Sequence, residues 1–186
     1  MEPKGIGTTG VARCAECGFL FSSVNADNAS VTVGRIGPAY AKVLRANSAV
    51  PWLRQRPSAK VWSPLEYATH MRNVLLLFAR RIQVISRDEQ PELEVMSHDD
   101  VVDAGDYNRL DPLTVAEEIR QAGRSLADVL AGLAPAGFAR RGFRDGEGRT
   151  VLEISQRAAH EAQHHLLDMA RGLGRSITVA RPDQSR

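Results

Sequence analysis

Aromatic residues, long apolar runs and a dominant charge are all scarce in this 186-residue sequence, and each shortage excludes a class of protein. Aromatics make up 5% of the chain, so Ala, Leu and Val supply most of the apolar side chains, which favours packed helices over a β-sandwich. The longest apolar run, residues 74–79, is far shorter than the roughly 18 residues that span a bilayer. A net charge of +2 gives no field that would indicate nucleic-acid binding. We expect neither a membrane nor a nucleic acid as a partner.

The first residues, MEPKGIGTTG, also lack the apolar segment of a secretory signal peptide, so we expect a cytoplasmic protein. The only two cysteines, Cys14 and Cys17, lie in the stretch C-A-E-C-G. In a reducing compartment this spacing indicates a metal site or a redox couple more than a structural disulfide. The length suits one compact domain, and the sequence leaves a homodimer open. We expect an irregular segment over 1–30, the domain over 31–174 and a flexible tail over 175–186.

Four segments carry the signals of amphipathic helices. The second begins with Ser63 and Glu66, and the fourth with Thr150 and Glu153, and each pair has the spacing of a capping box. Apolar residues then recur every three or four positions, which is the period of a helix with one buried face. The four expected helices cover about residues 30–47, 63–86, 111–132 and 150–172.

The remaining segments carry no sign of a paired strand. Residues 87–110 should form a long connection over one end of the domain, and residues 137–149 form a turn rich in Gly and Arg. Four helices without strand pairs or internal repeats predict an all-α fold, an antiparallel up-and-down four-helix bundle.

Three histidines indicate a metal site within this bundle. His160 and His164 are four residues apart on the fourth helix, so their imidazoles can converge on one ion, whereas His165 should point elsewhere. His70 lies beside the apolar stripe of the second helix and should point inward, where an imidazole needs a hydrogen-bond partner or a metal. We therefore expect His70, His160 and His164 to be metal ligands, the alternative being an ordinary polar face.

The stretch H-E-A-Q-H from His160 to His164 also has the spacing of zinc peptidases. Such enzymes need a third ligand further along the chain, yet no His or Glu follows His165. They also need an edge strand for an extended substrate, and none is expected here. A peptidase is therefore improbable, and the match is incidental.

Two stretches together, V-W-S-P-L-E-Y-A-T-H ending at His70 and H-E-A-Q-H-H starting at His160, resemble the DinB/YfiT-like superfamily. This superfamily includes mycothiol-dependent maleylpyruvate isomerases, and the likeness covers about residues 31–172. It implies a four-helix bundle in which a divalent metal, often zinc or nickel, is held by His70, His160 and His164. It further implies a small-molecule substrate and, in some members, mycothiol or another low-molecular-weight thiol as cofactor. An N-terminal C-x-x-C belongs to a subset of relatives.

Three imidazoles on a tetrahedral ion leave one position for water or a thiolate, which would suit a transferase, an isomerase or a hydrolase. Glu161 is the best candidate for a catalytic base, the alternative being a solvent-facing side chain. Asp168, one turn below, can orient a ligand imidazole. Three arginines before the fourth helix are candidates to bind an anionic cofactor or substrate, although surface solubility explains them equally well: Arg140, Arg141 and Arg144.

Three interpretations remain open for Cys14 and Cys17. They complete a Cys₂His₂ site with two of the histidines, hold a separate zinc with ligands such as His98 or His165, or act as a dithiol switch. The Gly-Phe that follows resembles a zinc knuckle and favours a metal over a redox role. If the cysteines fill the metal shell, catalysis gives way to binding. The sequence thus predicts a metal-dependent enzyme or, as the alternative, a non-catalytic zinc-stabilised bundle.

Overall fold

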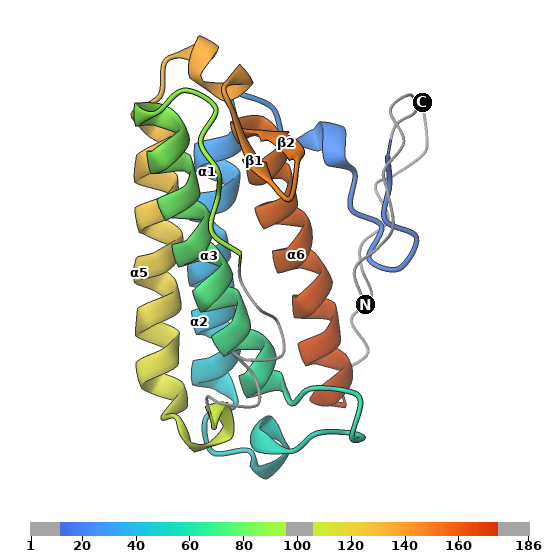
Figure 1. Cartoon of the computed structure of the whole chain (residues 1–186). Helices are drawn as coiled ribbons and strands as arrows, with labels where there is room; N and C mark the ends of the chain where they lie inside the picture. The colour runs from blue at the N-terminus through green and yellow to red at the C-terminus, as the bar shows by residue number, and fades with distance from the viewer. Residues whose placement is uncertain (1–11, 96–105, 175–186) are drawn as a thin grey trace, which may run out of the picture.

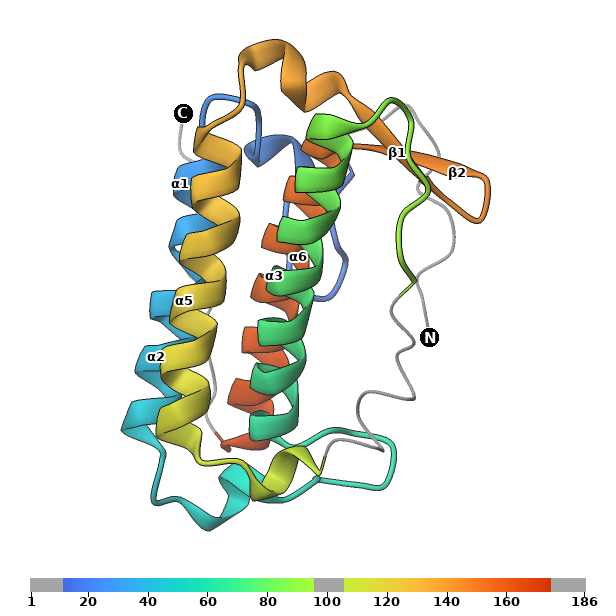
Figure 2. The same ribbon diagram turned by 60° about the vertical axis from the view of Figure 1, so that its left-hand side comes forward.

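The structure is a computed structural model that describes residues 12–95 and 106–174 and shows the expected all-α four-helix bundle (Figure 1). The predicted tail, 175–186, lies outside the described residues. The helices are α1 (Ala29–Gly34), α2 (Ile36–Ala46), α3 (Pro64–Arg87), α5 (Pro112–Ala131) and α6 (Val151–Gly172). The strands are β1 (Arg141–Arg144) and β2 (Glu147–Thr150). Because α1 and α2 follow one another end to end, they together form one of the four rods of the bundle (Figure 2).

The two predicted capping boxes define where α3 and α6 begin. Ser63 Oγ accepts from the amide of Glu66 at 3.1 Å, and the Glu66 carboxylate accepts from the amide of Ser63 at 2.7 Å. Thr150 and Glu153 repeat this exchange at 3.1 and 2.7 Å. Such caps satisfy amides that have no partner within the helix, and each typically contributes about 1 kcal/mol.

The helices do not simply alternate in direction. α5 packs between α2 and α3, and α3 packs between α5 and α6. α3 and α5 run the same way (Figures 1 and 2), because the residues that precede them meet at one end of the bundle, where Ser63 Oγ donates to Asn108 Oδ1 at 2.7 Å. At the other end, the amide of Leu93 donates a hydrogen bond to the carbonyl of Phe143 at 2.7 Å. The connection between α3 and α5 therefore reaches both ends of the bundle rather than lying over one end.

The first rod differs from the single helix predicted over 30–47, because it is interrupted at Arg35. Pro38 has no amide hydrogen to donate to the carbonyl of Gly34, which removes one helical hydrogen bond at this point. Helix α2 then crosses very close to α5 at Gly37. A Cβ at Gly37 would lie 2.7 Å from the carbonyl oxygen of Ile119 and 2.7 Å from Cα of Arg120. Glycine at this position allows the two backbones to touch.

The segment predicted as a Gly/Arg-rich turn contains a short hairpin instead. β1 and β2 pair antiparallel, with Arg141 opposite Thr150. Asp145 and Gly146 form the tight turn, and both have positive φ angles, 52° and 79°. An Asp-Gly turn of this kind matches the right-handed twist of a hairpin. The hairpin places the start of α6.

The core lies between all four rods, and α1 and α2 contribute buried side chains such as Val33, Tyr40 and Leu44. Leu75, Ile82, Ile119, Leu126 and Met169 are all fully buried there. In the described ranges, 12–95 and 106–174, no helix has both the length and the apolar character that crossing a membrane would take.

Candidate metal centres

The middle of α6 carries five side chains with metal-ligand or hydrogen-bonding chemistry, His160, Glu161, His164, His165 and Asp168. Each residue of a helix is rotated by about 100° from the one before it. His160 and His164 therefore share one face, and Glu161 and His165 share the next. The two pairs meet different partners in the fold.

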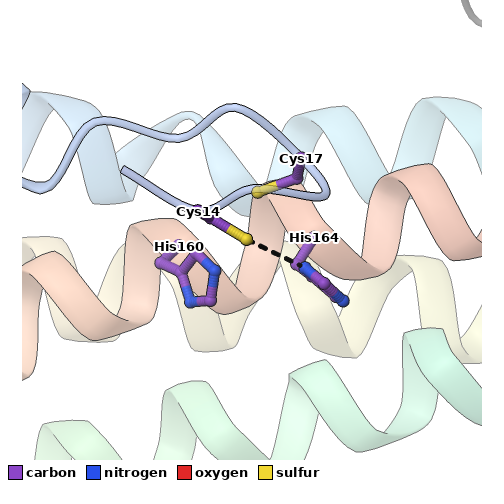
Figure 3. A group of neighbouring side chains, drawn as sticks. All are labelled: Cys14, Cys17, His160 and His164. Atoms are coloured by element: carbon purple, nitrogen blue, oxygen red, sulfur yellow. Dashed lines mark hydrogen bonds between the residues drawn. The ribbon is translucent and has the colours of Figure 1, made fainter. Parts of the chain in front are cut away.

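The first group, which we name the cysteine–histidine cluster, consists of Cys14, Cys17, His160 and His164 (Figure 3). One ligand atom from each residue lies within 4.8 Å of all the others. Cys14 Sγ is 3.7 Å from Nδ1 of His164. The cysteines approach α6 from a loop that runs above the helix, while both histidines rise from α6 itself (Figure 3).

The local fold of the N-terminal segment presents the two sulfurs to α6. The amide of Gly18 donates to the carbonyl of Cys14 at 2.9 Å, and Gly18 has a φ of 72°, in the region that favours glycine. Gln163 Nε2 on α6 donates to the carbonyl of Cys17 at 2.8 Å, which ties the loop to the helix. The rings of Phe19 and Phe21 pack against the imidazole of His160, at 5.7 and 5.0 Å between centroids.

The donors of this cluster fit a zinc ion. Two thiolates and two imidazoles form a common four-ligand shell for zinc. Nε2 of His160 is buried without a hydrogen-bond partner among the residues that the structure describes, an arrangement that a bound cation would satisfy. Burial raises the pKa of the Cys14 thiol, but hydrogen bonds from the Cys17 amide and the His160 ring outweigh it and lower that pKa to about 6. Burial and the neighbouring Cys14 sulfur raise the pKa of Cys17 to about 11.

The second group, which we name the three-donor cluster, consists of His70, Glu161 and His165. Its three ligand atoms also lie within 4.8 Å of one another, at the contact between α3 and α6. His165 Nε2 is 3.4 Å from Oε2 of Glu161, and the rings of His70 and His165 meet edge to face at 5.3 Å. The ring centroid of Trp62 is 5.2 Å from that of His70, and the ring centroid of Tyr67 is 5.0 Å from that of His165, so aromatic rings line the site.

The structure divides the three predicted histidine ligands between these two clusters. His160 and His164 lie with the cysteines, whereas His70 lies with Glu161 and His165. The rotation of about 100° per residue explains the division, because α3 packs against the face of α6 that carries Glu161 and His165. His165, expected to point elsewhere, faces His70. Glu161, for which a solvent-facing position was the alternative, is 19% exposed at its side chain.

Comparison with known proteins agrees with this fold. The family model described as the DinB superfamily matches residues 40–169. The chain belongs to the DinB superfamily. A solved structure described as "YfiT from Bacillus subtilis is a probable metal-dependent hydrolase with an unusual four-helix bundle topology" aligns with a TM-score of 0.69 at 16% identity. The alignment covers 81% of this chain and 89% of that one. A search of curated proteins found no significant match.

In this DinB-superfamily chain, two carboxylates lie near a histidine of each cluster: Glu161, itself a member of the three-donor cluster, and Asp168. Burial raises the pKa of Glu161, but hydrogen bonds from His160 and His165 outweigh it and hold that pKa well below its usual range. Burial also raises the pKa of Asp168, and its hydrogen bond with His165 and the charges of His165 and His164 lower it overall. Both side chains are therefore ionised at neutral pH.

The three predicted anion-binding arginines lie before α6 in this DinB-superfamily fold, in and next to the hairpin and away from the clusters. The Arg140 guanidinium donates to the carbonyls of Ile85 and Asp88, both at 2.7 Å. Arg141 and Arg144 belong to β1, and Arg144 Nε is 3.7 Å from the carboxylate of Asp145. His160 lies ten residues beyond the hairpin, a distance of about 15 Å along the helix. Arg140 thus contacts the end of α3, and anion binding stays a prediction.

A pocket of about 460 Å³ adjoins the cysteine–histidine cluster on another face of α6. Its lining includes Cys17 and Phe19 from the N-terminal segment, Arg35 from the junction of α1 and α2, and Ala162 and Leu166 from α6. The volume is typical of a small-molecule site, for which roughly 300–1,000 Å³ is usual. His98, the other candidate partner of the cysteines, lies outside the described residues.

Proposed function

We propose that this chain is a metal-dependent enzyme of the DinB superfamily that acts on a small molecule. In this proposal the three-donor cluster is the reaction centre, and the cysteine–histidine cluster holds a structural zinc. The observation that carries it is the convergence of His70, Glu161 and His165 within 4.8 Å where α3 meets α6. Two imidazoles and one carboxylate are the protein ligands of many catalytic zinc sites, in which a fourth position stays open.

A divalent metal at this site would lower the pKa of a bound water, or of a bound thiol, and so supply a nucleophile near neutral pH. The chain's own residues fix the site around it. Asp168 Oδ2 lies 3.1 Å from Nδ1 of His165, so the carboxylate holds the imidazole with Nε2 toward Glu161. The rings of Trp62 and Tyr67 pack against the imidazoles of His70 and His165. In this arrangement Glu161 acts as a ligand rather than as the free base expected from the sequence.

Two reaction classes fit such a centre. Water at the open position gives a hydrolase, whereas mycothiol or another small thiol gives a transferase or an isomerase. The structural neighbour YfiT is itself described as a probable metal-dependent hydrolase. We therefore favour hydrolysis and keep the thiol-dependent reaction as an outcome of the test.

A second candidate is a non-catalytic, metal-stabilised bundle with a binding role. The observation that favours it is the cysteine–histidine cluster, because four protein donors leave no position for a substrate. The pocket beside Cys17 would then be the binding site.

Metal analysis of three variants separates the two functions. We expect two metal ions per chain in the wild-type protein, one after His70→Ala and one after the double change Cys14→Ser and Cys17→Ser. Arg80→Ala, on the exposed side of α3, is the control and should retain both ions. Activity toward small esters and amides, measured with and without mycothiol, should be lost in His70→Ala. The double cysteine variant should keep this activity if it folds. A single ion that needs the cysteines and not His70 would establish the second candidate instead.

A further inference from the structure

We propose that the two clusters bind their metals cooperatively, because the carboxylates of Glu161 and Asp168 each lie near a histidine of both clusters. Metal in the cysteine–histidine cluster would then raise the affinity of the three-donor cluster. This inference rests on the proposed function for the identity of the second site. Its consequence is that the thiols of the N-terminal segment control the loading of the reaction centre.

The carboxylate of Glu161 reaches a histidine of each cluster. Its Oε1 is 3.7 Å from Nδ1 of His160, and its Oε2 is 3.4 Å from Nε2 of His165. The other nitrogen of His160, Nε2, is the buried atom that lacks a hydrogen-bond partner among the described residues. If Nε2 binds the metal, Nδ1 carries the proton and points it toward Glu161. One ligand of the three-donor cluster is thereby oriented by a ligand of the other cluster.

Asp168 forms the second link in the same way. Its Oδ2 is 3.1 Å from Nδ1 of His165 and 3.8 Å from Nε2 of His164. The opposite nitrogen of His164, Nδ1, is the atom that lies 3.7 Å from Cys14 Sγ. Asp168 thus stands behind one histidine of each cluster, on the side away from the proposed metal. It is a positioning residue for both.

The sign of the coupling follows from order and charge. A metal fixes the rings of His160 and His164, which fixes Glu161 and Asp168 before the second metal arrives, so less freedom is lost at the second step. Repulsion between the ions opposes this effect, but two cysteine thiolates cancel the charge of a divalent ion in the first cluster. Loss of a carboxylate that orients a ligand typically costs about 10–100-fold in metal affinity. We expect a coupling at the lower end, about 10-fold.

Titration of the metal-free, full-length chain with cobalt(II) tests the proposal. Sulfur-to-cobalt charge-transfer absorption reports the cysteine–histidine cluster, and visible ligand-field bands report both clusters. We expect the affinity of the three-donor cluster to fall about 10-fold after the double change Cys14→Ser and Cys17→Ser, although its own ligands remain. Asp168→Asn should weaken both clusters, while the exposed carboxylate change Asp128→Asn should weaken neither.

Thermodynamic linkage supplies a reciprocal experiment. His70→Ala should weaken cobalt binding at the cysteine–histidine cluster by the same factor, because a coupling free energy is shared equally by the two sites. Circular dichroism shows whether each variant is folded. If the double cysteine variant does not fold, the measurement on His70→Ala alone decides whether the two clusters are coupled. Unchanged affinity at each cluster when the other is disabled would overturn the coupling and leave the proposed function standing. Absence of cobalt from the three-donor cluster of the wild-type protein would overturn both.

Discussion

Replacing Gly37 with alanine should destabilise the bundle, because α2 and α5 touch backbone to backbone at this point. The added Cβ would lie 2.7 Å from the carbonyl oxygen of Ile119 and from Cα of Arg120. Both are backbone atoms of α5, and neither can rotate aside. A Cβ at Gly123, the facing residue, would in turn lie 3.0 Å from the amide nitrogen of Gly37. The two helices must separate to admit one methyl group.

The expected loss is the difference between two opposing terms. Alanine is favoured over glycine inside a helix by about 1 kcal/mol. Forcing a methyl group into a closed interface costs typically about 1–3 kcal/mol, and a backbone clash belongs at the upper end. The free energy of unfolding should therefore fall by about 2 kcal/mol. With a urea m-value of about 2–3 kcal/mol/M, the midpoint of denaturation would fall by roughly 0.7–1 M.

Gly34→Ala is the matched control, since it adds the same methyl group to the same rod. Its Cβ would meet only the Cβ of Ala127, at 3.4 Å, which is an ordinary contact. Urea denaturation followed by circular dichroism should show Gly34→Ala within about 1 kcal/mol of the wild-type protein. Equal stability of the two variants would refute the close approach of α2 and α5.

Two further predictions concern buried charge and the arginines before α6. Burial raises the pKa of the Glu66 carboxyl, but hydrogen bonds from Arg56 and Ser63 outweigh it and hold that pKa below the ordinary value of 4.5. The carboxylate therefore stabilises the folded protein above pH 4.5, and this contribution is lost as pH falls through the lowered pKa. Glu66→Gln should therefore cost about 2 kcal/mol at pH 7 and clearly less at pH 3, in urea denaturation at each pH. Arg140→Ala should cost about 1–3 kcal/mol, because two backbone carbonyls at the end of α3 lose their donor, whereas the exposed Arg141→Ala should change stability by less than about 0.5 kcal/mol. A larger loss for Arg141→Ala than for Arg140→Ala would contradict the second prediction.

Local signals in the sequence were sufficient to predict α3, α5 and α6, whereas the interruption of the first rod at Arg35 was not predicted. The capping boxes at Ser63 and Thr150 mark the starts of α3 and α6, and the apolar periodicity marks their buried faces. The hairpin could have been predicted too, because Asp145-Gly146 is a strong turn signal. It was missed because its short strands are rich in Arg and Gly rather than in β-branched residues.

The grouping of the metal ligands was not accessible in the same way. Spacing shows that His160 and His164 share a face of α6, but Glu161 and His165 have the same spacing. Which pair meets His70 depends on how α6 is rotated against α3, a property of packing rather than of local sequence. The direction of α5 posed a similar problem, because a long connection permits a helix to run either way.

The N-terminal segment cannot take its place against α6 until this last helix of the bundle has been synthesised. Gln163, which holds the carbonyl of Cys17, follows that residue by 146 positions. At about 5–20 residues per second, a ribosome would need roughly 7–30 s to extend the chain from one to the other. Throughout that interval α6 is not yet available to pack against the two thiols of the nascent chain, and they are accessible to oxidants and to free metal ions. The cell's reducing capacity would thus act on this protein most strongly before it has folded.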